Sequence, residues 1–154
     1  MMVIDLTSAD AILPALKAAS KKQALQEMCA RAAKISGLGE REIFDAILQR
    51  ERLGSTGVGS GVAIPHCKLE KAREIFGVFA RLDRPVDFDS QDGAPVDLIF
   101  LLIAPESAGA DHLKALARAA RVFRDPAFTA RLRATRDPAA LHLMLTQAPA
   151  VHAA

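Results

Sequence analysis

Apolar residues recur with the period of an α-helix in the first third of the chain. Ser20 followed by Gln23 forms a capping-box pair, and Gly37 is placed to end a helix. The pattern therefore predicts one helix over about 21–36 and a second from near Glu40 to Arg52. The residues that define their buried faces are Leu25, Met28, Cys29 and Ala32 in the first helix, and Ile43, Phe44, Ile47 and Leu48 in the second.

Apolar runs of strand length follow a glycine-rich loop over 54–61. Residues 62–64 predict a short strand, and Pro65 is expected to end regular pairing there. Residues 75–82 predict a buried strand, 86–88 continue extended, and Asp92-Gly93 indicates a turn. The nearly continuous apolar run 96–103 predicts a central strand covered on both faces.

The last third of the chain returns to helical spacing over 113–123. Asp125-Pro126 and Asp137-Pro138 each pair an N-cap residue with proline at the first helical position, which predicts two short helices. Helices on either side of a set of strands predict an α/β sandwich around one sheet. The length of 154 residues fits a single domain over 1–147, with an Ala-rich tail, 148–154, that we expect to be flexible.

Composition excludes several classes of protein. The formal net charge of +2 and the dispersed Lys and Arg residues do not favour a nucleic-acid partner. Two cysteines, Cys29 and Cys67, make no disulfide framework, which favours a cytoplasmic location. No apolar run reaches the length of about 18 residues that a membrane span needs, so no stable membrane insertion is expected.

Two histidines and one of two neighbouring arginines are candidates for chemistry. His66 follows Pro65, which fixes the backbone before it, and a neutral imidazole nitrogen is a nucleophile at physiological pH. His112 stands in the first turn of a predicted helix, where free N–H groups favour an anion. Arg50 or Arg52 could grip a phosphoryl oxygen by a bidentate contact. Each has a structural alternative. His66 could simply pack at a strand end, and His112 could be a partly exposed residue at a helix start. Arg50 and Arg52 could be cations that stabilise a helix C-terminus.

Nucleotide and metal sites find little support. The glycine-rich loop contains no lysine and precedes a strand, unlike a P-loop or a dinucleotide fingerprint. His66 and Cys67 are adjacent on extended chain and point to opposite faces, so they are not expected to share a metal ion, and a metal pair of His66 with His112 would need a third ligand. Cys29 lies on an apolar helix face and is expected in the core.

The segment from Gly54 to His66, Gly-Ser-Thr-Gly-Val-Gly-Ser-Gly-Val-Ala-Ile-Pro-His, resembles the active-site segment of the fructose/mannitol-type IIA family of the phosphotransferase system. Later stretches, 85–89, 92–102 and 112–117, resemble further segments of that family in the same order. The resemblance runs from about Leu6 to Leu145 and is strongest to the nitrogen-regulatory members.

The resemblance implies a mixed, roughly five-stranded sheet between helices and assigns a role to each candidate. His66 would accept the phosphoryl group, Arg50 rather than Arg52 would neutralise its oxygens, and His112 would donate a hydrogen bond to it. A loop containing Gly57, Gly59, Gly61 and Pro65 would support the phosphate site. The phosphoryl donor would be an HPr-like carrier of the nitrogen branch, so no metal or other cofactor is expected.

The resemblance is compatible with two functions of the phosphorylated protein. A regulatory protein would change its binding to target proteins when His66 is phosphorylated. Potassium transporters and sensor kinases are candidate targets at the level of the family. The alternative is the IIA component of a sugar permease, which passes the phosphoryl group to a IIB domain. Cys67 stands where family members often have glycine, which suggests the hypothesis of an oxidation-sensitive site.

Overall fold

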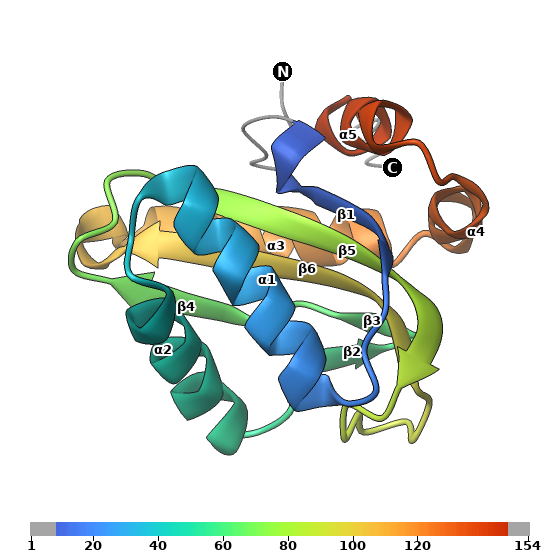
Figure 1. The fold of residues 1–154 in the computed structure, drawn as a ribbon, viewed down its shortest axis with the longest axis horizontal. Helices are drawn as coiled ribbons and strands as arrows, with labels where there is room; N and C mark the ends of the chain where they lie inside the picture. Colours follow the sequence, from blue (N-terminus) through green and yellow to red (C-terminus); the bar gives the residue numbers. More distant parts are fainter. Residues whose placement is uncertain (1–8, 148–154) are drawn as a thin grey trace.

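The computed structural model describes residues 9–147, in which helices lie on both sides of a sheet (Figure 1). Residues 1–8 and the expected tail 148–154 lie outside the described part. In chain order the elements are the 3₁₀ turn Ala9–Ala11, β1 Ile12–Leu16, α1 Lys21–Ser36, α2 Glu40–Arg52, β2 Gly57–Gly59, β3 Val62–Ala63, β4 His66–Leu69, β5 Phe76–Val86, β6 Val96–Pro105, the 3₁₀ turn Glu106–Ala108, α3 Ala110–Phe123, α4 Pro126–Ala134 and α5 Pro138–Thr146.

The sheet of the described residues has six strands, where about five were expected. Its order is β1-β5-β6-β3-β2, and β4 also pairs with β6. β1 is parallel to β5, both β3 and β4 are parallel to β6, and the β5–β6 and β2–β3 pairs are antiparallel. The prediction of a mixed sheet between helices, with 96–103 as a central strand, is confirmed.

β3 and β4 lie one after the other along the same edge of β6. Val62 is opposite Leu98, and His66 is opposite Leu102. Pro65 has no N–H to donate, but its carbonyl accepts a hydrogen bond from the Leu102 amide at 2.9 Å. The expectation that pairing ends at Pro65 is therefore wrong, because pairing is only interrupted there and resumes at His66.

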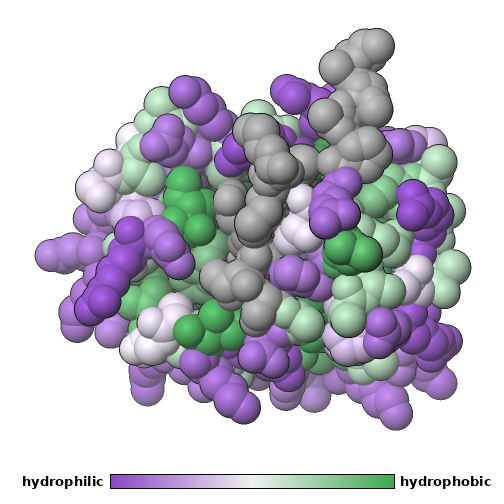
Figure 2. Space-filling model, turned by 90° about the horizontal axis from the view of Figure 1, so that it is seen from above, coloured by the Kyte–Doolittle hydropathy of each residue, from purple (hydrophilic) through white to green (hydrophobic). Residues whose placement is uncertain are grey.

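Each face of the sheet carries its own apolar core. Side chains from α1 and α2 pack on one face with Val78, Ile99 and Leu101, and side chains from α3, α4 and α5 pack on the other with Phe79 and Phe100. The alternation of the strand residues sends neighbours to opposite cores. Viewed from above, the surface is mostly hydrophilic, with small separate hydrophobic patches (Figure 2).

The predicted helix ends are confirmed. The Ser20 side chain accepts a hydrogen bond from the Gln23 amide, and Gly37 closes α1 with φ of 79° in the left-handed region. The Asp125 and Asp137 side chains cap α4 and α5, each with proline at the start of the helix. β1 and β2 were not predicted, since β1 contains a proline and β2 lies within the glycine-rich segment.

Candidate functional site

Three elements bring His66, Arg50 and His112 together. His66 is the first residue of β4, Arg50 lies in the last turn of α2, and His112 lies in the first turn of α3. The Arg50 Nε is 3.3 Å from the His66 Nε2, and the two imidazole ring centroids are 5.6 Å apart. The local sequence patterns indicated these three residues one by one, and only the family resemblance gave them a joint role; in the fold, Arg50 and His112 both lie beside the His66 imidazole.

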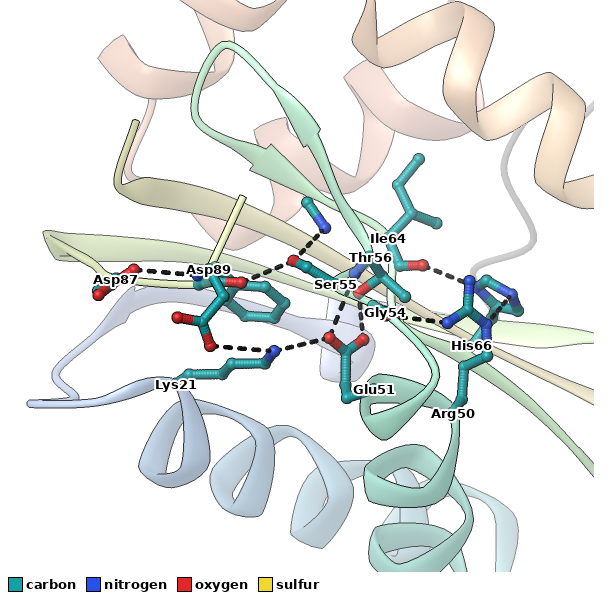
Figure 3. Close-up of polar contacts among 12 residues, drawn as sticks. Lys21, Arg50, Glu51, Gly54, Ser55, Thr56, Ile64, His66, Asp87 and Asp89 are labelled. Carbon is teal, nitrogen blue, oxygen red and sulfur yellow. Dashed lines mark hydrogen bonds and ion pairs between the residues drawn. The ribbon is translucent and has the colours of Figure 1, made fainter. Parts of the chain in front are cut away.

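The hydrogen bonds of His66 determine its tautomer. The ring Nδ1 is 2.9 Å from the carbonyl oxygen of Ile64, and a carbonyl can only accept, so Nδ1 carries the proton. The Nε2 atom of the neutral ring then holds a lone pair, toward which the Arg50 Nε–H donates (Figure 3). The nitrogen available for nucleophilic attack is therefore Nε2.

The surroundings of His66 favour its neutral form. Burial of the ring lowers the pKa of His66 below its ordinary value of 6.5, and the nearby Arg50 guanidinium lowers it further. The hydrogen bond to the Ile64 carbonyl and the Glu51 carboxylate oppose this shift. The balance keeps the Nε2 lone pair free of a proton at neutral pH.

His112 offers an unused polar atom to the site. The residue is 8% exposed, and its Nε2 is buried with no hydrogen-bond partner among the described residues. Burial, His66 and Lys68 lower its pKa. Gly109 precedes α3 without a side-chain cap, so N–H groups of the first turn remain free for a ligand. Both features suit a bound anion.

Arg50 is held in place by a second contact. Its Nη1 donates to the carbonyl oxygen of Gly54 at 3.0 Å, directly after the end of α2. Arg52 has neither contact and is exposed. The structure therefore places Arg50, and not Arg52, beside the imidazole.

An open hollow of about 480 Å³ lies in front of His66. Leu53 at its rim is 83% exposed, although a leucine side chain normally avoids water. The residues that line the hollow are Ala46, Gln49, Arg50, Leu53, His66, Cys67, Lys68 and His112. A group that approaches the His66 ring would meet all three candidate side chains.

The glycines expected around the phosphate lie elsewhere. Gly61 is opposite the start of β6, where its carbonyl accepts from the Asp97 and Leu98 amides, whereas His66 pairs four positions further along β6. That separation corresponds to about 13 Å of strand. The β2–β3 hairpin that contains Gly57 and Gly59 is anchored by Arg133, whose Nη2 donates to the Ser60 carbonyl. Of the expected support residues, only Pro65 adjoins His66.

A buried carboxylate next to Arg50 was missed by the sequence analysis. Glu51 contacts Lys21 and Thr56 below the site (Figure 3). The missed signal was its position, because Glu51 continues the buried stripe of Ile43 and Ile47 at a spacing of four residues. Cys67 and Cys29 are both buried in the core on the α1 and α2 side, as expected for Cys29.

Among residues 9–147, no group of three or more His, Cys, Asp or Glu side chains is arranged to hold a metal ion. No helix in this part of the chain is both long enough and apolar enough to cross a bilayer.

Comparison with known proteins gives consistent matches. Residues 5–148 match the family described as "Phosphoenolpyruvate-dependent sugar phosphotransferase system, EIIA 2". A nitrogen regulatory protein of Bradyrhizobium diazoefficiens is 61% identical over 153 residues, which is 99% of this chain and 100% of that protein.

Solved structures share the fold. The crystal structure of nitrogen regulatory protein IIA-Ntr from Neisseria meningitidis superposes with a TM-score of 0.85 at 35% identity, over 90% of this chain and 94% of that one. IIA mannitol from Escherichia coli superposes with a TM-score of 0.75 at 25% identity, over 90% and 96% of the two chains.

Proposed function

The chain belongs to the EIIA type 2 family of the phosphoenolpyruvate-dependent sugar phosphotransferase system, and from this premise we propose that it accepts a phosphoryl group on Nε2 of His66 and regulates partner proteins according to its phosphorylation state. The observation that carries the proposal is the contact of Arg50 with the unprotonated Nε2 of His66, with the His112 ring beside the His66 ring.

The proposed reaction is an in-line transfer from a phosphohistidine of an HPr-like carrier of the nitrogen branch. The His66 Nε2 lone pair forms the new N–P bond while the carrier's N–P bond breaks, and that electron pair returns to the carrier's ring nitrogen. The proton stays on the His66 Nδ1, hydrogen-bonded to the Ile64 carbonyl. The acceptor ring therefore becomes positively charged when Nε2 carries the dianionic phosphoryl group.

Arg50 and His112 stabilise the transferred group. The Arg50 guanidinium leaves Nε2 and pairs with phosphoryl oxygens, for which its planar array of N–H groups is suited. The unpartnered Nε2 of His112 and the uncapped start of α3 would supply further donors to the same oxygens. Preorganised donors of this kind lower the barrier because they need no rearrangement of water.

The surface near His66 suits a docking protein. Leu53 is 83% exposed at the rim of the hollow, and Leu113, which follows His112, is 65% exposed. Contact with a carrier would remove both side chains from water, which is favourable. The same surface would present the phosphoryl group and its charge to regulated partners, so phosphorylation would change their affinity.

Intact mass after incubation with phosphoenolpyruvate, the nitrogen-branch enzyme I and its HPr-like carrier tests the proposal. We expect an acid-labile gain of one phosphoryl group in the wild type and none in His66→Ala. No gain in the wild type with active carriers would refute it. Onward transfer to a fructose- or mannitol-type IIB protein would favour the alternative of a permease component.

A further inference from the structure

Glu51 is a buried carboxylate with a full set of partners. Its side chain is 4% exposed, and the Lys21 Nζ is 2.8 Å from its Oε1. The Thr56 backbone N–H donates to Oε1 at 3.2 Å, and the Thr56 hydroxyl donates to Oε2. Burial of a carboxylate costs several kcal/mol unless it is paired, which this arrangement provides.

The hydrogen bonds continue from this carboxylate to the reactive histidine. The Thr56 carbonyl accepts from the Ile64 N–H at 3.0 Å, and the Ile64 carbonyl accepts from the His66 Nδ1–H at 2.9 Å. One chain of contacts therefore runs from the Glu51 carboxylate through Thr56 and Ile64 to the imidazole (Figure 3). Each link fixes the orientation of the next.

We propose that Glu51 and Thr56 are positioning residues, which hold the Ile64 carbonyl so that His66 keeps its proton on Nδ1 and presents the lone pair of Nε2. The inference rests on the proposed function, since it assigns Nε2 as the phosphoryl acceptor. Without this support the Ile64 peptide could rotate, and the proton could move to Nε2, where it would block attack.

Glu51 also acts on His66 through its charge. The carboxylate raises the pKa of His66, whereas Arg50 lowers it. Because the His66 ring becomes positively charged when it accepts a phosphoryl group, a fixed negative charge behind the ring stabilises the product. The Lys21 Nζ pairs with this carboxylate at 2.8 Å and lies 4.7 Å from the centre of the Phe88 ring, so the side chain of Glu51 is held in place.

A set of matched substitutions tests the positioning role. Thr56→Val removes the hydroxyl at nearly constant volume, Thr56→Ser keeps it, and Ser55→Ala removes a neighbouring hydroxyl that donates instead to the Phe88 carbonyl at 2.6 Å. The first measurement is ¹⁵N-histidine NMR of the unphosphorylated protein, which reports the tautomer of His66. The second is the rate of phosphoryl transfer.

We expect Thr56→Val to populate the Nε2–H tautomer and to slow transfer by about 3–10-fold, the effect of one buried hydrogen bond. Thr56→Ser and Ser55→Ala should both keep the wild-type tautomer of His66 and the wild-type rate of phosphoryl transfer. A wild-type tautomer and rate in Thr56→Val, or an equal loss in Ser55→Ala, would overturn the proposal.

Glu51→Gln provides a second test that does not depend on Thr56. We expect the NMR titration midpoint of His66 to fall, because a charge that favours the protonated ring is removed. An unchanged midpoint would contradict the role of that charge. If the wild type accepts no phosphoryl group, the proposed function fails, but the tautomer and titration measurements still decide this inference.

Discussion

Arg50 gives the sharpest quantitative prediction, because its removal has two opposite effects on phosphoryl transfer. Its Nε donates to the lone pair of the His66 Nε2 at 3.3 Å, and this contact must break before attack. Arg50→Ala removes that obstacle, which is worth at most about 1.5 kcal/mol or about tenfold in rate. It also removes a donor to the transferred phosphoryl group, which costs about 10²–10³-fold.

The second effect is larger, so Arg50→Ala should slow the transfer by a net factor of about 10 to 10³. The transfer rate of Arg50→Lys should lie between those of the wild type and Arg50→Ala, because lysine keeps the charge but not the planar array of donors. Arg52→Ala is the matched control, since Arg52 is exposed and adjoins the same helix end. It should transfer at the wild-type rate.

The assay is a rapid-quench time course of phosphorylation by the phosphorylated carrier, at a temperature where every variant is folded. Thermal unfolding checks the last condition, because loss of the Arg50 contact to the Gly54 carbonyl is expected to cost about 1 kcal/mol. A wild-type rate in Arg50→Ala, or an equal loss in Arg52→Ala, would show that the Arg50 guanidinium does not stabilise the transferred group.

Four further predictions follow from the geometry. His112→Ala should slow transfer to His66 by about 10²-fold, as expected for loss of one preorganised donor, and an unchanged rate would remove His112 from the site. Because the pKa of His66 lies below 6.5, most of the ring is neutral at pH 6.5, so the transfer rate should lose less than half of its value as the pH falls to 6.5. The unfolded chain binds this proton more readily, so the free energy of unfolding should decrease as the pH falls below 6.5, and an increase there in urea titrations would contradict this sign. Burial raises the pKa of the Cys67 thiol to about 12, so mild peroxide should leave it unmodified in the folded protein, and rapid oxidation seen by mass spectrometry would restore the hypothesis of a sensitive site. Gly61→Ala should cost about 1–2 kcal/mol in chemical denaturation, because φ is +81° and the added Cβ would lie 2.6 Å from the Arg133 Nη2; an unchanged midpoint would show that the hairpin adapts freely.

Local signals in the sequence predicted the helices well. The Ser20 and Gln23 pair, Gly37 and the two Asp-Pro pairs satisfy backbone groups within a few residues, so their effect can be predicted without knowledge of the rest of the fold. The central strand was equally clear, because a continuous apolar run is needed where both faces of a strand are covered.

The strands that depend on a partner were harder to predict. β1 contains Pro14, and β2 is only Gly57–Gly59, so neither has a strand pattern of its own. β4 was missed because Pro65 indicates an end to pairing, whereas β6 continues past it and pairs with the residues that follow. Their formation is decided by the neighbouring strand and not by local preference.

In the site, too, some features could be predicted from the sequence and others depend on contacts between distant segments. The resemblance identified His66, Arg50 and His112, and the structure brings these three together. The resemblance could not indicate that Gly59 lies beside Asp92 and Gly61 beside Arg133, and not beside the imidazole, since this depends on the register of β3 against β6. The contacts of Glu51 join residues from three segments, which no spacing rule connects.

Phosphorylation of His66 on Nε2 can be observed directly. The most direct test is NMR of the phosphorylated, ¹⁵N-histidine-labelled protein, in which coupling between phosphorus and nitrogen identifies the substituted ring atom. We expect phosphorus bound to Nε2 of His66, with the proton still on Nδ1. Phosphorus on the Nδ1 of His66, or on His112, would contradict it.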